Sequence, residues 1–246
     1  MESDKEVAIN SVKEDDEEAS NKASPATPIQ KFVAEFIGTA FLVFIVTGIP
    51  VFSLGDFSYN GSFEAAFVLA SMIYVFGRIS GAHFNPAVTI PMMLREKITV
   101  IECGYYICAQ ILGAFFGSIL VALCNKGDFK NLAGNVVGGK EFWDYFSSFL
   151  IEIILTFGLV FVIFASTIKE NNFGNLTGFI VGISLYFLGI AGSKVSGGSL
   201  NPARSIAPAI IMIFKGEYEP IKNLWVYILA PIIGGICAGY LNILFE

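Results

Sequence analysis

One short polar motif occurs twice in this chain, once in each apolar half. The tripeptide Asn-Pro-Ala stands at 85–87 and again at 201–203, and each copy follows a Ser-Gly pair at the same distance. A single Asn-Pro pair indicates only a helix start, because asparagine is a good N-cap and proline fits the first helical turn. Two matched copies in very apolar surroundings constrain the fold further. They predict two polar turns that line a hole through a membrane.

The repetition extends beyond this motif. Residues 35–44 align with 152–161 at an offset of 117, the motifs themselves are offset by 116, and residues 109–117 resemble 230–238. Each half is therefore predicted to hold three membrane spans and one shorter helix. An odd number of spans per half forces the second copy to be inverted in the membrane.

Long apolar runs supply the spans. The chain is 54% hydrophobic and holds 24 phenylalanines, and a helix needs about 20 apolar residues to cross the hydrocarbon core. Four runs reach that length: 32–54, 100–124, 146–168 and 224–245. Two shorter runs, 63–76 and 176–190, each lead into an Asn-Pro-Ala turn.

A further short apolar helix is expected after each turn, at 85–94 and 201–214. At about 1.5 Å per residue each covers about 15–20 Å, roughly half of the hydrocarbon core. Two such helices entering from opposite faces could meet near the midplane. Strands are disfavoured because the runs are continuous rather than alternating. We expect an all-α membrane protein with six transmembrane helices, two re-entrant half-helices and an inverted three-helix repeat.

The first thirty residues differ in composition from the rest. They hold eight acidic residues and three lysines, so they account for −5 of the net charge of −6. They lack the basic-then-apolar order of a signal peptide, so we expect a retained, disordered acidic tail at 1–30. A channel domain is expected at 31–246, with repeats at about 31–124 and 144–246. No nucleic-acid partner is expected.

The chain offers little of the chemistry that enzymes use. It has a single histidine, His83, and its four cysteines fall within or at the ends of apolar runs. Such cysteines are better interpreted as small packing residues than as disulfides or metal ligands. No metal-ligand spacing, phosphate loop or catalytic triad is present in the sequence. We therefore expect no enzymatic activity, no cofactor and no metal.

Residues 80–89, Ser-Gly-Ala-His-Phe-Asn-Pro-Ala-Val-Thr, and residues 201–205, Asn-Pro-Ala-Arg-Ser, give the chain a specific resemblance. From about residue 31 to its end it resembles the aquaporin (major intrinsic protein) family. That resemblance implies a homotetramer in a lipid bilayer, with one pore per subunit. It also implies a pore centre formed by the two motifs: Asn85, Pro86, Ala87, Asn201, Pro202 and Ala203.

In such a pore each asparagine caps a half-helix through its side-chain oxygen, leaving its amide free to donate into the lumen. The positive ends of both half-helix dipoles then converge on one point. They disfavour cations and protons there.

The resemblance also implies a narrow selectivity ring that includes an arginine, which matches Arg204. Counting without gaps from each asparagine places the other three ring positions at Ala65, Gly189 and Gly198. Water-selective relatives usually have an aromatic residue and a histidine there, whereas all three are small here. This resembles the wide filters of some plant nodulin-like channels for metalloid acids, and a wider ring should admit solutes larger than water.

Two observations oppose a wide ring. Ser205 and Ala209 match the pattern of water channels. A slip in the gap-free count would place Phe63 or Phe67 in the ring instead of Ala65 and narrow it. We favour the small ring, because pore radius acts directly on the solute.

Four ionisable residues in or near the spans need a role. Glu35 and Glu152 are costly mid-span carboxylates, which either relay protons or accept hydrogen bonds from the re-entrant backbone. The family resemblance favours the second role. His83 either lines the inner pore or makes a structural hydrogen bond, and we favour the bond. Arg78 either contacts lipid headgroups or narrows the inner vestibule, and we favour the headgroup contact.

The function we expect is a passive channel for water and small neutral solutes, such as glycerol, urea or metalloid acids, that excludes protons and ions. One alternative is a strictly water-selective aquaporin. An alternative of another class is a proton-coupled secondary transporter, since inverted repeats, broken helices and buried glutamates also occur there. The protein is expected to be a multi-pass integral membrane protein, with plasma and vacuolar-type membranes both left open.

Overall fold

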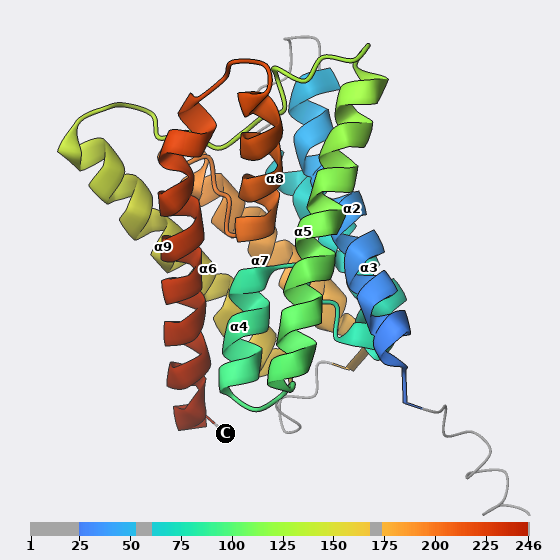
Figure 1. Ribbon diagram of the computed structural model, residues 1–246. Coiled ribbons are helices and arrows are strands. Elements are labelled where there is room, and N and C mark those ends of the chain that lie inside the picture. The colour runs from blue at the N-terminus through green and yellow to red at the C-terminus, as the bar shows by residue number, and fades with distance from the viewer. Residues whose placement is uncertain (1–24, 53–60, 168–173, 246) are drawn as a thin grey trace, which may run out of the picture.

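The computed structural model describes residues 25–52, 61–167 and 174–245. Within these residues the chain forms eight α-helices and no strand (Figure 1). The helices are α2 (Pro28–Phe52), α3 (Ser62–Ser80), α4 (Pro86–Leu94), α5 (Val100–Cys124), α6 (Phe142–Thr167), α7 (Thr177–Gly192), α8 (Pro202–Ile213) and α9 (Glu219–Leu241). Most of the expected acidic tail, 1–24, lies outside the described residues.

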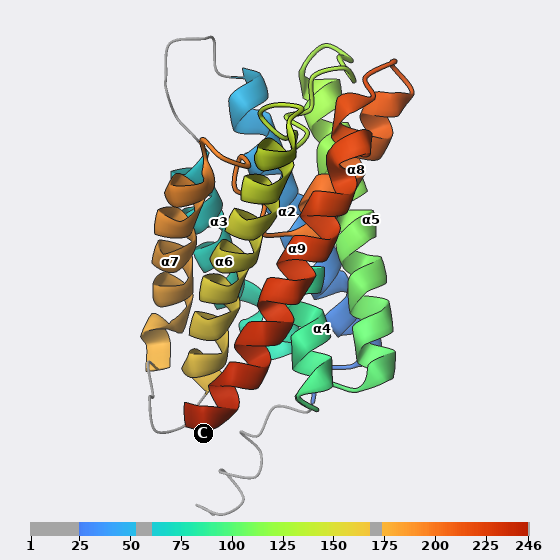
Figure 2. The same ribbon diagram turned by 90° about the vertical axis from the view of Figure 1, so that its left-hand side faces the viewer.

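The six expected spans correspond to α2, α3, α5, α6, α7 and α9. Five of these helices are long and apolar enough to cross a membrane, and the 16-residue α7 is shorter. A 3₁₀ turn at Gly174–Leu176 extends α7 at its start. The start of α2 and the end of α9 lie at the same end of the bundle, as six crossings require (Figures 1 and 2). The predicted all-α membrane architecture is confirmed.

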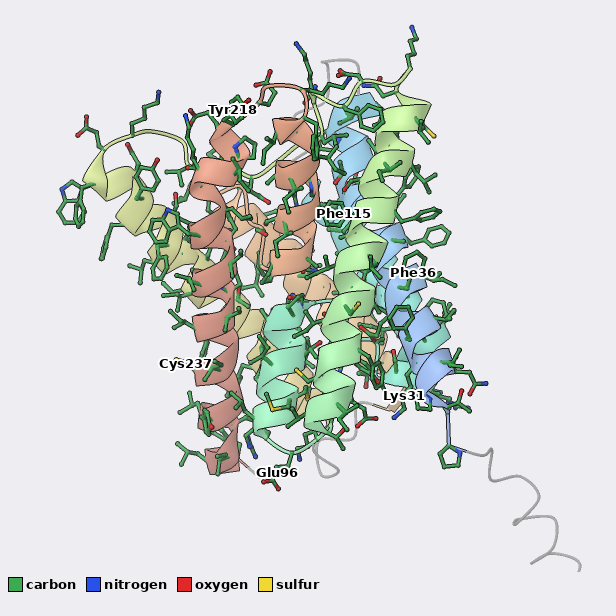
Figure 3. All side chains as sticks on the ribbon, in the orientation of Figure 1. Lys31, Phe36, Glu96, Phe115, Tyr218 and Cys237 are labelled. Atoms are coloured by element: carbon green, nitrogen blue, oxygen red, sulfur yellow. The ribbon has the colours of Figure 1, made fainter. Side chains whose placement is uncertain are left out.

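The two ends of the bundle can be located by their side chains. Lys31 and Glu96 lie at one end, here called the basal end, and Tyr218 lies at the opposite, apical end (Figure 3). The short helices α4 and α8 are stacked one above the other between α5 and α9 (Figure 1). With nine and twelve residues, neither can span a membrane. Their N-termini meet in the middle of the molecule, as the inverted repeat predicts.

Glycines bring the long helices of each half into backbone contact. A Cβ atom on Gly113 or Gly117 of α5 would collide with the backbone of α2, at the carbonyl oxygens of Phe36 and Ala40. In the second half, Gly234 of α9 has the same relation to the carbonyl oxygen of Ile153 in α6. Small residues let helices approach closely in a membrane, where lipid offers no hydrophobic force between them.

The two halves also meet through small residues. A Cβ atom on Gly182 of α7 would lie 2.7 Å from the carbonyl oxygen of Ala66 in α3, and one on Gly178 would lie 3.1 Å from that of Ala70. The outward faces of the bundle carry large apolar side chains instead, such as Phe41, which is 53% exposed. The bundle therefore has an apolar exterior suited to lipid.

Candidate pore and selectivity site

Each half-helix begins at an asparagine that caps it. Asn85 has an extended backbone, and its Oδ1 accepts a hydrogen bond of 2.8 Å from the Ala87 N–H. Asn201 does the same for α8, accepting from the Ala203 N–H at 3.0 Å. The proline that follows each asparagine suits the first helical position, where no N–H partner exists within the helix. The Asn-Pro-Ala motifs are thus the two helix starts that face each other at the centre.

The side-chain amides of these asparagines link the two halves. The Asn85 Nδ2 donates to the carbonyl oxygen of Leu200 at 2.8 Å, and the Asn201 Nδ2 donates to that of Phe84 at 2.9 Å. The sequence predicted an amide free to donate into the lumen, and the structure uses one hydrogen of each amide in this link between the halves. An amide nitrogen carries two hydrogens, so one on each asparagine stays available to a molecule in the pore. The sequence could not reveal this link, because it joins residues more than a hundred positions apart.

The segments that lead into the asparagines have an unusual backbone. Ala82, Phe84 and Leu200 all have positive φ, at 54°, 50° and 54°. Each such residue other than glycine costs on the order of 1–3 kcal/mol, so the surrounding structure must hold it in place. The side chains of Phe84 and Leu200 are fully buried in one apolar cluster with Leu42 and Leu155, which anchors both turns.

Two buried glutamates hold these turns from behind. Both carboxylates are completely buried. Glu35 accepts from the backbone N–H groups of His83 at 3.0 Å and Phe84 at 2.7 Å. Glu152 accepts from those of Ser199 and Leu200, each at 2.8 Å. This geometry is that of a backbone acceptor, which is the role favoured from the sequence.

Further donors complete the two carboxylate sites. Ser80 and Ser196 each donate a hydroxyl, at 2.6 Å to Glu35 and 2.7 Å to Glu152 respectively. Glu35 has one more donor, the Gln110 amide at 2.8 Å. Hydrogen bonds to a charged group are stronger than those between neutral groups and contribute about 1.5–3 kcal/mol each. Together they offset the cost of burying each carboxylate and the backbone cost of the residues with positive φ.

A continuous cavity of about 1040 Å³ runs along the bundle between the two halves. Its wall includes Pro50 and Ser193 toward the apical end, both asparagines in the middle, and Arg78 and Asn175 toward the basal end. Much of the remaining wall is aliphatic, with side chains such as those of Leu69, Ile73, Val88, Leu159 and Val181. An apolar conduit with polar groups at its centre is suited to small neutral molecules.

All four residues assigned to the selectivity ring lie on this wall: Ala65, Gly189, Gly198 and Arg204. The two alternatives to Ala65 do not, since Phe63 and Phe67 are 48% and 54% exposed on the outer face of α3. The unshifted count therefore agrees with the position of Ala65. Three of the four ring positions present nothing larger than a methyl group to the cavity.

The two ring glycines are needed for packing as well as for width. A Cβ atom on Gly198 would lie 3.1 Å from the carbonyl oxygen of Gly189, and one on Gly189 would lie 2.6 Å from the Oγ of Ser62. Gly198 also has a φ of +64°, which disfavours any side chain. Ser62 lies on the cavity wall one helical turn before Ala65, so a hydroxyl stands beside Gly189. Ser62 was not predicted from the sequence.

Arg204 is held against the wall by the loop between α5 and α6. Its guanidinium donates from Nη1 to the Asn135 side-chain oxygen at 2.6 Å and from Nη2 to the Ala133 carbonyl oxygen at 3.1 Å. Only 9% of the Arg204 side chain is exposed. Asn135 was also missed from the sequence, because its loop has no periodic pattern that would place it in the pore.

The other two predicted inner-pore residues, His83 and Arg78, both border the cavity. His83 is 8% exposed, and its Nδ1 lies 3.2 Å from the hydroxyl of Thr89. The two interpretations of His83 are therefore compatible, since the same ring lines the cavity and makes a structural hydrogen bond. Arg78 is exposed at the basal end of the cavity, a position that favours the vestibule over a contact with headgroups alone.

The whole sequence is similar to those of known proteins. A sequence model of the family described as Major intrinsic protein matches residues 22–242. The chain is 39% identical over 216 residues to Glycerol uptake facilitator protein-like 6 of Lactiplantibacillus plantarum, covering 86% of this chain and 96% of that protein. It is 34% identical over 243 residues to Nodulin-26 of Glycine max, covering 96% and 85% of the two chains.

A solved structure shares the fold. The X-ray structure of the aquaglyceroporin from Plasmodium falciparum superposes with a TM-score of 0.78. The match covers 88% of this chain and 96% of that one, at 23% sequence identity. The two molecules therefore share the same overall fold.

Proposed function

The chain belongs to the major intrinsic protein family, and from this premise we propose that it is a passive channel for water and small neutral solutes. The solutes we expect include glycerol, urea and metalloid acids. The protein is a multi-pass integral membrane channel and not an enzyme. The similarity to a protein named for glycerol uptake supports glycerol as one of these solutes.

The observation that carries the proposal is the small ring on the cavity wall. Ala65, Gly189 and Gly198 line the same cavity as Arg204, and none of the three has a side chain larger than a methyl group. Pore width acts on every solute that passes, so a ring without an aromatic side chain should admit molecules with several heavy atoms. Arg204 and the Ser62 hydroxyl supply donors that a solute hydroxyl can use in place of water.

Ion exclusion follows from the central arrangement. The N-termini of α4 and α8 face each other at Asn85 and Asn201, so the positive ends of both half-helices point at the middle of the cavity. Arg204 adds a full positive charge on the same wall. A cation or a proton would meet all three, whereas an uncharged molecule would meet only hydrogen-bond donors.

Permeability measurements on proteoliposomes test the solute range. In a gradient of impermeant sucrose, vesicles that contain the protein should shrink faster than protein-free vesicles. In a gradient of glycerol, urea or boric acid they should shrink and then swell again as the solute enters. Rapid water flow with solute entry no faster than in protein-free vesicles would favour the alternative of a strictly water-selective aquaporin.

The proton-coupled transporter is the alternative of another class. Its buried carboxylates would have to exchange protons, but Glu35 and Glu152 each accept at least three hydrogen bonds in the wall behind the pore and do not line the cavity. Solute flux that neither responds to an imposed pH gradient nor changes internal pH would exclude coupling.

We also propose that the channel is a homotetramer with one pore in each subunit. The cavity is enclosed by helices of a single chain, which supports one pore per subunit. Native mass spectrometry of the detergent-solubilised protein should give four times the mass of the 26.7 kDa chain. A monomeric mass under mild conditions would contradict this assembly.

A further inference from the structure

The part of the cavity wall formed by α3 is apolar over most of its length. From Ala65 toward the basal end, the next residues of α3 on the wall are Leu69 and Ile73. One hydroxyl precedes this stretch: Ser62, the first residue of α3, lies on the same wall one helical turn before Ala65. Its side chain is 6% exposed. A polar group therefore stands at the level of the ring on a helix that otherwise offers only carbon to the cavity there.

The Ser62 hydroxyl makes no hydrogen bond to the residues that the structure describes. Other helical serines of this chain donate to the carbonyl oxygen four residues earlier, as Ser71 does to Phe67 and Ser184 to Ile180, each at 2.8 Å. Ser62 stands at the first position of its helix, so no helical turn precedes it to supply such an acceptor. Its hydroxyl is therefore available to a molecule in the cavity.

This hydroxyl occupies the space that a side chain at residue 189 would need. A Cβ atom on Gly189 would lie 2.6 Å from the Ser62 Oγ, and one on Gly198 would lie 3.1 Å from the Gly189 carbonyl oxygen. The two glycines thus lie between Ser62 and the segment that leads to Arg204. Ser62 and Arg204 are polar groups on two different elements, α3 and α8, that border one ring.

The two groups offer a solute different chemistry. A guanidinium has five N–H donors and no acceptor. Two of those donors on Arg204 are used by the side chain of Asn135 and the carbonyl of Ala133, and the others remain for a solute. A serine hydroxyl can donate and accept. The ring side chains therefore present charged donors from α8 and, through Ser62, a donor and acceptor from α3.

We propose that Ser62 is a specificity-determining residue of the channel, whose hydroxyl binds the polar group of a trigonal solute that points away from Arg204. The solutes it favours are planar molecules with polar groups at three corners, such as boric acid and urea. The proposal rests on the proposed function, because it distinguishes among the solutes of that channel.

The shape of the solute decides how much this hydroxyl contributes. The polar groups of a trigonal molecule point to the corners of a triangle, so a single polar wall cannot bind all of them. Glycerol is a flexible chain, which can turn its hydroxyls toward one wall and its carbons toward the apolar one. A solute group without a partner in the ring loses the hydrogen bond that it made with water. Ser62 therefore helps a trigonal solute more than it helps glycerol.

Two substitutions at this position test the proposal. Ser62→Ala removes the hydroxyl and leaves more space, whereas Ser62→Cys fills the space with a thiol, which is a weak hydrogen-bonding group. Stopped-flow light scattering gives each solute permeability as a ratio to the water permeability of the same vesicles. Loss of one net hydrogen bond should lower the boric acid and urea ratios by about fivefold in both variants, while the glycerol ratio should stay within about twofold of the wild-type value.

Ser71→Ala is the matched control. It removes a hydroxyl from the same helix, but that hydroxyl is bound to the Phe67 carbonyl and residue 71 does not line the cavity. All three solute ratios should therefore equal those of the wild-type protein. A fall confined to boric acid and urea, present in both Ser62 variants and absent in Ser71→Ala, supports the proposal.

The opposing outcomes separate this role from the solute range itself. If the wild-type protein passes all three solutes, unchanged ratios in the Ser62 variants overturn the role of Ser62 and leave the proposed function standing. Faster entry of every solute in Ser62→Ala would show that residue 62 acts through pore width alone, and an equal fall for glycerol would show no preference for trigonal shape; either result overturns the proposal. A wild-type protein that passes water but none of these solutes overturns both the solute range and the role of Ser62.

Discussion

The side-chain amide of Asn85 donates a 2.8 Å hydrogen bond to the backbone carbonyl of Leu200, which lies 115 residues away in the other half of the chain. Asn201 returns the same bond to the first half. Each asparagine therefore caps its own half-helix and holds the turn before the other one. The centre of the pore is one unit formed by both halves, and a change on one side should be felt on the other.

The first prediction concerns charge at this centre. Asn85→Asp keeps the oxygen that caps α4 but replaces the donor with a carboxylate oxygen that faces the Leu200 carbonyl. The negative charge should offset the positive ends of the two half-helices and admit protons, while the lost bond should destabilise the fold by about 1–3 kcal/mol. Acidification of dye-loaded liposomes and the thermal unfolding temperature measure the two effects.

The control for this change is Asn131→Asp, which adds the same charge to an exposed residue of the α5–α6 loop. It should alter neither quantity. Tight proton exclusion by correctly folded Asn85→Asp channels would show that the asparagine amide is not part of the barrier.

The second prediction concerns the packing of α2 on α5. Gly113→Ala places a methyl group against the backbone of Phe36 and Ala40 in α2, and backbone atoms cannot move aside as the end of a flexible side chain could. Overpacking of this kind costs about 1–3 kcal/mol, so the unfolding temperature in detergent should fall. Gly104→Ala is the matched control on the same helix, because a Cβ atom there meets nothing within 4 Å. Equal stability of the two variants would contradict close α2–α5 contact.

Much of this fold could be predicted because a membrane imposes simple rules on length and composition. The run at 100–124 became α5 without change, and the two short helices start at the asparagines that the Asn-Pro pairs indicated. Glu35 and Glu152 were identifiable since buried carboxylates in a span need partners. The family resemblance, rather than spacing alone, supplied the ring positions.

The missed features all depend on contacts between distant segments. Asn135 lies in a loop with no periodicity, so only the folded chain brings it to Arg204. Ser62 became part of the ring wall because Gly189 has no side chain to cover it. The second hydrogen bond of each central asparagine depends on an exact approach of two turns, which no local pattern encodes.

The third prediction concerns the buried carboxylates. Glu35→Gln replaces an oxygen acceptor with an amide donor that faces the N–H group of His83 or Phe84. At least one buried donor then loses its partner, so the fold should lose about 1–3 kcal/mol of stability. Exposed Glu141→Gln serves as the control and should unfold at the wild-type temperature. Thermal unfolding in detergent provides the measurement.

The same variant separates a channel from a coupled transporter. Glu35→Gln channels that remain folded should pass water as fast as wild-type channels, with or without a pH gradient, because the carboxylate supports the turn and does not face the cavity. Loss of transport in folded, correctly assembled Glu35→Gln protein would instead assign the carboxylate a direct part in conduction.

The last prediction concerns the width of the ring. Ala65→Trp places an indole on the wall of the cavity that Arg204 also lines, where the present side chain is a methyl group. An indole takes up space that a solute with several heavy atoms needs, so we expect glycerol permeability to fall by about tenfold or more, which corresponds to a barrier increase of about 1.4 kcal/mol. Water is smaller and should be reduced less. Stopped-flow measurements on the same vesicles give both values.

Phe67→Trp is the matched control for this variant, since residue 67 lies on the same helix and is 54% exposed on its outer face. It adds an indole to α3 without reaching the cavity, so both permeabilities should stay at wild-type values. If Ala65→Trp also left glycerol flow unchanged, residue 65 would not lie at the narrowest part of the pore. Selectivity would then have to be set elsewhere along the cavity, with the Arg78 end the next place to narrow.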